Sequence, residues 1–240
     1  TGRLVAKERG VAAGLDAAVV VFDYLGVDAE RSVEAGDQVT AGDAVLTAEG
    51  SAREVLRGER VAVNVVGHAS GVATKTSEAV AAARRESDDV RIAGTRKTTP
   101  GLRGIEKRAV VAGGGDSHRL DLSHMVMVKD NHIAEMGLTD AVEHFRDRVS
   151  FATKIEVEVE SPEMGRRAAE AGADIVLFDN LSPSAVTEGV DALPAGTLAE
   201  ASGGITVDDV PDYAATGVDV ISMGALTHSA AALDYSFRTG

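Results

Sequence analysis

The second half of the chain has one pattern that restricts its fold more than any other: short apolar, β-branched runs alternate with single helical segments. One such unit occurs twice, because residues 172–179 and 217–224 share a leading glycine, an aspartate two positions later and an apolar run after it. Strands of this kind, each followed by one helix, are typical of a parallel sheet that is closed or partly closed into a barrel. We therefore predict an α/β barrel over residues 90–240.

Six runs have the length and composition of barrel strands. They are Val90–Ala93, Met125–Val128, Ile155–Val159, Asp174–Phe178, Thr197–Ala201 and Asp219–Met223. The helices between the later strands have recognisable ends. Ser161 and Ser182 are each followed by proline, as at a helix N-terminus. Gly172 and Gly217 stand where a helix C-terminus favours a left-handed residue.

Residues 1–50 alternate short apolar stretches with turn signals at Gly36-Asp37 and Gly42-Asp43. This pattern predicts a small β-rich subdomain. From Ser51, which can cap a helix, a helical pattern continues to about Arg85 with one glycine-containing break. We expect residues 1–89 to form an N-terminal subdomain with its long helix, and 240 residues are enough for this subdomain and a barrel.

Charge and composition exclude several classes of function. A formal net charge of -14 argues against a nucleic-acid or anionic-membrane partner, because neutralising phosphates needs clustered lysine and arginine. The absence of cysteine excludes thiol catalysis, thiolate zinc sites and disulfide scaffolds. No apolar run approaches the roughly 20 residues that span a bilayer, and the first residues lack the layout of a signal peptide. We expect a cytoplasmic protein.

Charged and glycine-rich segments follow successive predicted strands, where the reactive face of an α/β barrel lies. Arg96, Lys97 and Lys129 belong to these segments, and His118 and Arg119 stand between the first two predicted strands. They predict a cationic wall suited to a small polyanion, because guanidinium groups bind carboxylates bidentately. Each segment alone is also compatible with an ordinary solvated loop or turn. Their recurrence at the same ends of successive strands favours an active site.

Carboxylates and glycines complete the expected site. In residues 154–160, apolar and acidic residues alternate, so the acids share one face of a strand. On the side opposite the cationic wall, we expect Glu158 and Asp179 to offer the hard oxygen ligands that Mg²⁺ prefers, or hydrogen bonds to ribose hydroxyls. The last two loops stand where many barrels hold a phosphate. The glycines that free backbone N–H groups there are Gly203, Gly204 and Gly224.

From Thr95 onward the chain contains several strings of residues in a fixed order. They are Thr95–Arg103, Glu106-Lys107, Gly113–Gly115 with His118-Arg119, Lys129–Ile133, Glu156–Glu158, Asp179-Asn180, Ser202–Gly204 and Gly224–Ser229. In order and spacing these strings resemble the quinolinate phosphoribosyltransferase family, over essentially the whole chain. The resemblance implies an N-terminal α/β sandwich packed on an incomplete parallel α/β barrel. It also implies a homodimer, or a higher even homo-oligomer, whose active sites are shared between subunits.

The same resemblance implies decarboxylating transfer of a phosphoribosyl group from phosphoribosyl pyrophosphate to quinolinate, a step of NAD biosynthesis, with Mg²⁺ as cofactor. The quinolinate carboxylates would be held by Arg96, His118, Arg119 and Lys129, with Arg60 from the other subunit. Phosphoribosyl pyrophosphate and Mg²⁺ would be served by Lys97, Glu158 and Asp179, the two acids being the metal ligands. The phosphate end would be lined by Ser202, Gly203, Gly204, Gly224 and His228. The catalytic groups would be Lys97, Lys129, Glu158 and Asp179.

Other functions fit parts of the sequence. Related phosphoribosyltransferases of the same fold act on nicotinate or a molybdenum-associated substrate, although several cationic groups favour a diacid. The strands around residues 39–43 resemble a lipoyl or biotinyl carrier module, but such a module needs an exposed lysine in a hairpin, and none lies between Lys7 and Lys75. A Schiff-base aldolase that uses Lys129 is a further alternative.

Overall fold

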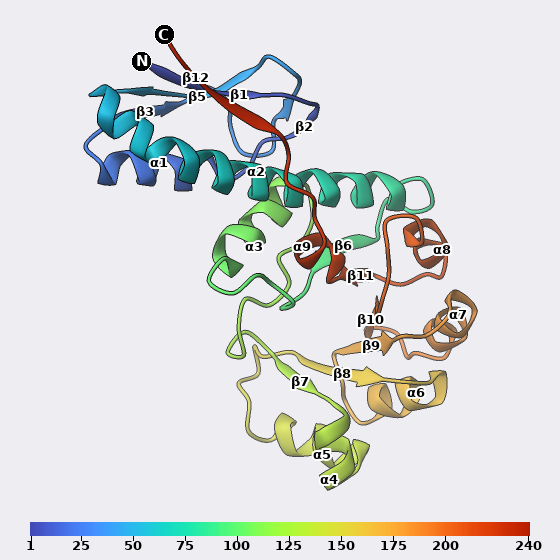
Figure 1. Cartoon of the computed structure of the whole chain (residues 1–240). Helices are drawn as coiled ribbons and strands as arrows, with labels where there is room; N and C mark the ends of the chain where they lie inside the picture. Colours follow the sequence, from blue (N-terminus) through green and yellow to red (C-terminus); the bar gives the residue numbers. More distant parts are fainter. The chain divides into compact units, whose positions relative to one another are not determined.

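The computed structural model describes every residue, Thr1–Gly240, and the chain forms two compact units. The first unit consists of Thr1–Val80, Lys97–Ser117 and Leu226–Gly240, and the second of Ala81–Arg96 and His118–Ala225. Each unit is thus assembled from segments that are far apart in the sequence (Figure 1).

The first unit contains an antiparallel sheet with the strand order β12-β1-β5-β3. Its strands are β1 (Gly2–Ala6), β3 (Asp28–Arg31), β5 (Ala44–Glu49) and β12 (Tyr235–Thr239). Two shorter strands, β2 (Gly10–Val11) and β4 (Gln38–Val39), form a separate pair. Helices α1 (Leu15–Tyr24) and α2 (Ala52–Ala83) line one face of the larger sheet (Figure 1). This arrangement confirms the predicted α/β sandwich.

Helix α1 forms although the valines at its centre, residues 19–21, favour a strand. Its buried residues Leu15, Ala18 and Phe22 are spaced three and four apart, so they form one apolar stripe along the helix. Phe22 is fully buried and packs against Gly58 of α2, where a β-carbon would come within 2.7 Å of the ring. Packing therefore outweighs strand propensity here, and the β-rich pattern predicted for residues 1–50 misses this helix.

The second unit is built on a parallel sheet with the strand order β6-β11-β10-β9-β8-β7. Its strands are β6 (Arg91–Gly94), β7 (Val126–Val128), β8 (Ile155–Val159), β9 (Ile175–Asp179), β10 (Leu198–Ser202) and β11 (Val220–Met223). All six predicted strands are present, and the boundaries differ by one residue at most. Strands β6 and β7 lie at the two edges and are not paired with each other, which confirms an incomplete barrel.

Helices follow the strands of this sheet. In the second unit they are α4 (Asp130–Met136), α5 (Leu138–Arg146), α6 (Pro162–Glu170), α7 (Pro183–Asp191) and α8 (Val210–Ala214). Ser161 and Ser182 cap α6 and α7 as predicted, because each side chain accepts the N–H three residues on, at 3.2 and 3.4 Å. Gly172 and Gly217 adopt the expected left-handed conformation, with φ of +101° and +89°. The two remaining helices are α3 (Arg103–Ala112) and α9 (Ala225–His228).

Helix α2 is continuous from Ala52 to Ala83, so the predicted glycine-containing break is wrong. One of its glycines serves close packing instead. A β-carbon on Gly71 would come within 1.9 Å of the carbonyl oxygen of Ala231, so only glycine lets the segment before β12 cross the helix there. Neither α2 nor any other helix combines the length and apolarity needed to cross a membrane.

Candidate active site

Polar side chains of the second unit gather where its strands end. Lys129 directly follows β7, Glu158 is the penultimate residue of β8 and Asp179 ends β9. Ser202 ends β10, and Gly224 directly follows β11. Because all the strands are parallel, these residues lie along one edge of the sheet, which is the edge where α/β folds bind their ligands.

Lys129 and Glu158 form an ion pair across the neighbouring strands β7 and β8. The register pairs Val128 with Val157, so the residues that follow these two lie side by side. The predicted layout, with the cationic wall opposite the carboxylates, is therefore wrong at this point. The two side chains are 43% and 22% exposed, so both can still meet a ligand.

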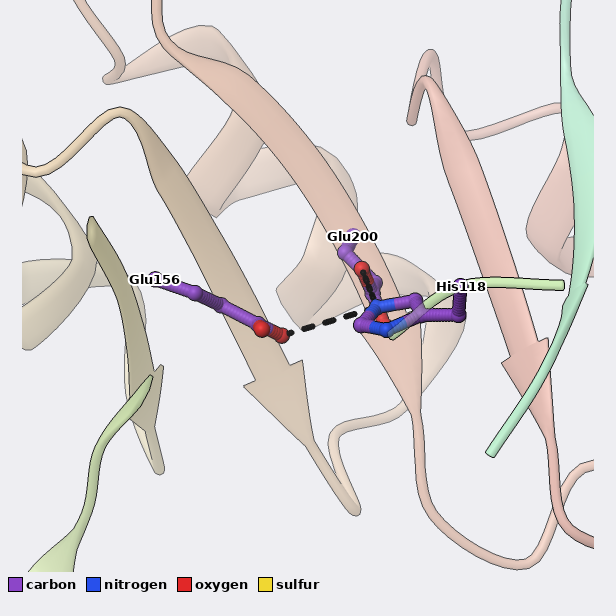
Figure 2. A group of neighbouring side chains, drawn as sticks. All are labelled: His118, Glu156 and Glu200. Atoms are coloured by element: carbon purple, nitrogen blue, oxygen red, sulfur yellow. Dashed lines mark hydrogen bonds and ion pairs between the residues drawn. The ribbon is translucent and has the colours of Figure 1, made fainter. Parts of the chain in front are cut away.

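A second group of charges is buried beside the sheet and consists of Glu156 of β8, Glu200 of β10 and His118 (Figure 2). Nε2 of His118 lies 3.1 Å from Oε2 of Glu200 and 4.0 Å from Oε1 of Glu156. Alternation along β8 places Glu156 on the same face as Glu158. The exposed fractions of Glu156 and Glu200 are 0% and 2%, so both carboxyl groups are removed from water.

This burial changes the acidity of Glu156. Loss of hydration raises the pKa of the Glu156 carboxyl to about 8, and the nearby charge of Glu200 adds to the increase. The positive charges of His118, Arg119 and Lys129 oppose it. Neither oxygen of Glu156 accepts a hydrogen bond within the chain. Since two adjacent buried carboxylates do not both ionise readily, the pair carries less than two negative charges near neutral pH.

His118 is held at both ring nitrogens. Its backbone is left-handed, with φ of +52°, and its Nδ1 accepts the following N–H, that of Arg119, at 2.8 Å. The ring proton is therefore assigned to Nε2, which donates to Glu200. A histidine and two glutamates within 4.8 Å of one another are a donor set that divalent metals use. A metal ligand must offer a lone pair, however, and Nε2 carries the proton, so we assign this group to hydrogen bonding.

The guanidinium of Arg119 is largely enclosed in the protein. Arg119 is 9% exposed, and its Nη2 lies 2.7 Å from the sulfur of Met127. Burial lowers the pKa of Arg119 from its ordinary value, and the positive charge of Arg96 adds to this, while Glu156 opposes it. A partly desolvated cation near a second cation gains more than a surface cation does from binding an anion. The arrangement therefore favours an anionic ligand.

The loop after β10 is shaped by its glycines. Gly203 and Gly204 have φ of +101° and +65°, a conformation that other residues rarely adopt. A β-carbon on Gly203 would lie 2.5 Å from the backbone nitrogen of Asn180, and that nitrogen donates to the carbonyl of Ser202 at 2.9 Å. Glycine thus allows the loops after β9 and β10 to approach closely, as in turns that bind phosphate through backbone N–H groups.

Two family models cover nearly the whole chain. The N-terminal domain of quinolinate phosphoribosyl transferase matches residues 1–70, and the C-terminal domain matches residues 72–238. The chain belongs to the quinolinate phosphoribosyltransferase family. The probable nicotinate-nucleotide pyrophosphorylase (carboxylating) of Methanothermobacter thermautotrophicus is 47% identical over 241 residues, which cover 98% of this chain and 86% of that protein.

A human protein and a bacterial crystal structure of this family are also similar to the chain. The nicotinate-nucleotide pyrophosphorylase (carboxylating) of Homo sapiens is 42% identical over 98% of this chain and 80% of its own length. The crystal structure of NadC from Streptococcus pyogenes has a TM-score of 0.92 to this chain at 40% identity, and the match covers 99% of this chain and 85% of that one.

The residues that the family resemblance singles out are divided between the two units. Those in the second unit are Arg96, His118, Arg119, Lys129, Glu158, Asp179, Ser202, Gly203, Gly204 and Gly224. Those in the first unit are Arg60, Lys97 and His228. Within the first unit, Thr227 Oγ1 donates to the carbonyl oxygen of Lys97 at 2.7 Å. Because Thr227 directly precedes His228, the backbones of Lys97 and His228 lie close together. Arg60 is exposed on α2.

Sequence reasoning missed Glu156 and Glu200 as members of the site. A signal was present for Glu200, because it is the one charged residue of β10 and stands between two alanines. A lone carboxylate in an otherwise small and apolar strand is seldom buried without a partner. For Glu156, the alternating acids of β8 gave the correct face, although only Glu158 was assigned a role.

Proposed function

We propose that this member of the quinolinate phosphoribosyltransferase family transfers the phosphoribosyl group of phosphoribosyl pyrophosphate to quinolinate with loss of CO₂. The bond from ribose C1 to pyrophosphate breaks as the pyridine nitrogen bonds to C1. The bond from ring C2 to its carboxylate then breaks, CO₂ leaves, and C2 takes a proton from solvent. The products are nicotinate mononucleotide, pyrophosphate and CO₂. The observation that carries the proposal is the nearly buried guanidinium of Arg119 with the charge of Arg96 close by.

In this proposal the cations bind the two carboxylates of quinolinate. Arg96 and Arg119 pair with them through guanidinium forks, and Lys129 adds an ammonium at the end of β7. Both ring nitrogens of His118 are already engaged. His118 therefore reaches a carboxylate only by giving up Glu200, and otherwise it holds the backbone of Arg119.

Decarboxylation follows from the charge on the ring. Once the pyridine nitrogen is bonded to ribose it is positively charged, so the ring can accept the electron pair that the departing CO₂ leaves at C2. Lys97 or Lys129 orients the 2-carboxylate. Electrostatic stabilisation by fixed cations is the main contribution of the protein to the rate.

The second substrate and its metal use the remaining groups. Glu158 and Asp179 fit Mg²⁺ by donor type, because they are carboxylates at the ends of the neighbouring strands β8 and β9. When bound there, Mg²⁺ would offset the charge of the departing pyrophosphate. Lys97 serves the same substrate. The phosphate group would be bound by Ser202, Gly203, Gly204, Gly224 and His228.

The proposal includes a homodimer, or a higher even homo-oligomer, in the cytoplasm. Arg60 would enter the active site of a second subunit. Its exposure on α2 supports this role, because a guanidinium held in the interior of its own chain could not reach a neighbour.

Turnover of two related acids tests the proposed function. The purified protein is incubated with phosphoribosyl pyrophosphate, Mg²⁺ and either quinolinate or nicotinate, and CO₂ and nicotinate mononucleotide are measured. We expect quinolinate to react, and nicotinate to react at least roughly 10²-fold more slowly, because a missing carboxylate leaves a desolvated cation unpaired. Equal turnover of the two acids would contradict the assignment to quinolinate.

A further inference from the structure

Glu106 of α3 is a fully buried carboxylate in the first unit, outside the groups discussed above. Its Oε1 lies 2.8 Å from Nε2 of His68 on α2, and its Oε2 accepts the backbone N–H of Thr99 at 3.0 Å. The adjacent Lys107 donates to the carbonyl oxygen of Ser117. Glu106 therefore bridges a helix and a loop.

Such a carboxylate is poorly explained by stability alone. A buried charge loses its hydration, and a well-packed apolar side chain of similar volume usually stabilises a fold as well or better. Buried charges of this kind are better suited to fixing one geometry than to adding free energy of folding. We therefore expect Glu106 to fix the position of a segment of the backbone.

The loop that Glu106 holds carries Lys97. Thr99 is held by Glu106, Lys97 accepts a hydrogen bond from Thr227 at 2.7 Å, and Arg103 Nε donates to Thr98 Oγ1 at 3.0 Å. Lys97 itself is exposed, whereas Thr227 and Glu106 are buried. The backbone of residues 97–99 is thus anchored from the interior, with the lysine on the outer side.

We propose that Glu106 is a positioning residue for Lys97, and that His68 fixes the carboxylate that does the positioning. The proposal rests on the proposed role of Lys97 toward phosphoribosyl pyrophosphate. Glu106 need not touch a substrate. It acts by holding the N–H of Thr99, so that the ammonium of Lys97 starts from a fixed backbone.

Two substitutions separate positioning from charge. In Glu106→Gln, the side-chain oxygen still accepts from Thr99, and the amide donates to His68 in its other neutral tautomer. In Glu106→Leu, the volume is similar but nothing accepts the N–H of Thr99. We expect kcat/KM for phosphoribosyl pyrophosphate to fall by roughly 10²-fold in Glu106→Leu and by less than about 3-fold in Glu106→Gln, since a displacement of about 1 Å can have an effect of that size.

A double-mutant cycle with Lys97→Ala then tests whether Glu106 acts through Lys97. If it does, Glu106→Leu lowers kcat/KM by less than about 3-fold in the Lys97→Ala background. Equal losses in both backgrounds would overturn the proposal, because a merely structural role does not depend on Lys97. Should Glu106→Leu fail to fold, Glu106→Asp serves in its place, because its shorter side chain keeps the charge but cannot reach both His68 and Thr99.

Hydrogen exchange provides a measurement that does not depend on catalysis. We expect the peptide that contains Thr99 to exchange at least roughly tenfold faster in Glu106→Leu than in the wild type. The matched control is Ser70→Ala, which removes a fully buried hydrogen-bonding side chain on a different helix, α2, where Ser70 contacts Ala13 and Tyr235. Unchanged exchange in Glu106→Leu, or equal acceleration in the control, would refute the anchoring. If the wild type does not turn over quinolinate, the proposed function fails while exchange still decides the anchoring.

Discussion

A lysine and a glutamate in direct contact should not respond independently to mutation. Lys129 and Glu158 are such a pair. We expect Lys129→Met to weaken quinolinate binding and Glu158→Gln to weaken use of phosphoribosyl pyrophosphate, each lowering kcat/KM by roughly 10²-fold. The double variant should lose less than the product of the two effects, because either change already breaks the pair. Kinetics of the four proteins measure this coupling.

Stability should respond much less than activity, because a half-exposed ion pair contributes only about 0–1 kcal/mol. The melting temperature of each variant should therefore fall by a few degrees at most. Arg166→Met is the control, because it removes an exposed ion pair with Glu163 on α6. Its activity should stay at the wild-type level. Strictly multiplicative losses in the Lys129 and Glu158 cycle would contradict the coupling.

The buried carboxyl group of Glu156 leads to a prediction about how the stability of the protein depends on pH. Its folded-state pKa of about 8 lies above the ordinary value of 4.5, so between these values the folded protein retains a proton that the unfolded chain has released. Its contribution to stability therefore falls as the pH rises through this window. Glu156→Gln removes the titration. We expect the melting temperature of the variant, relative to the wild type, to rise steadily from pH 5 to pH 8 in the absence of Mg²⁺ and substrates.

The exposed Glu160, just beyond the same strand, provides the matched control. Glu160→Gln should differ from the wild type by the same amount at every pH in this range. A difference between Glu156→Gln and the wild type that stays constant, or that declines with rising pH, would show that Glu156 is ionised in the folded protein.

At the scale of an element, the turn after β10 can be tested by a pair of glycines with the same φ. Gly203 and Gly172 both have φ of +101°, but a β-carbon meets Asn180 only at position 203. Alanine should cost about 1–2 kcal/mol of stability at either position through backbone strain. We expect only Gly203→Ala to displace the turn, and to raise the Kd for phosphoribosyl pyrophosphate by at least roughly tenfold. Calorimetric titration of both variants checks this, and equal affinities would show that the turn does not bind the phosphate.

The same elements show what could be predicted from the sequence. Strands β8 to β11 were predicted to within one residue, because β-branched runs between capped helices leave little freedom. Helix α1 was missed because its valines favour a strand, and only packing of Phe22 against Gly58 reveals the helix. The contact of Lys129 with Glu158 was also missed. This contact depends on which strands are neighbours and on the register between them. Neither the strand order nor the register can be deduced from the residue pattern of a single strand.

At the scale of the whole molecule, the proposal that two subunits share each active site can be tested by mixing subunits. Suppose that Arg60→Ala and Lys129→Ala are each nearly inactive as dimers. When equal amounts are unfolded and refolded together, about half of the dimers should be hybrids. If Arg60 serves the partner, one site of each hybrid carries both lesions and the other carries none. Activity should then recover to roughly a quarter of the wild type. A mixture with demonstrated hybrids and no recovered activity would place Arg60 in the site of its own chain.

The pairing of β1 with β12 has a consequence for how the protein is made. Gly2 pairs with Thr239, so β1 lies between β5 and β12, a strand that is translated after β1 to β11. At about 5–20 residues per second, translation from β1 to β12 takes roughly 10–50 seconds, and β12 cannot pair with β1 before then. The strands of the second unit, by contrast, have all been translated before β12. The antiparallel sheet can therefore be completed only after all strands of the parallel sheet have been translated, and until β12 emerges the edge of β1 that it covers is open to chaperones or to another nascent copy.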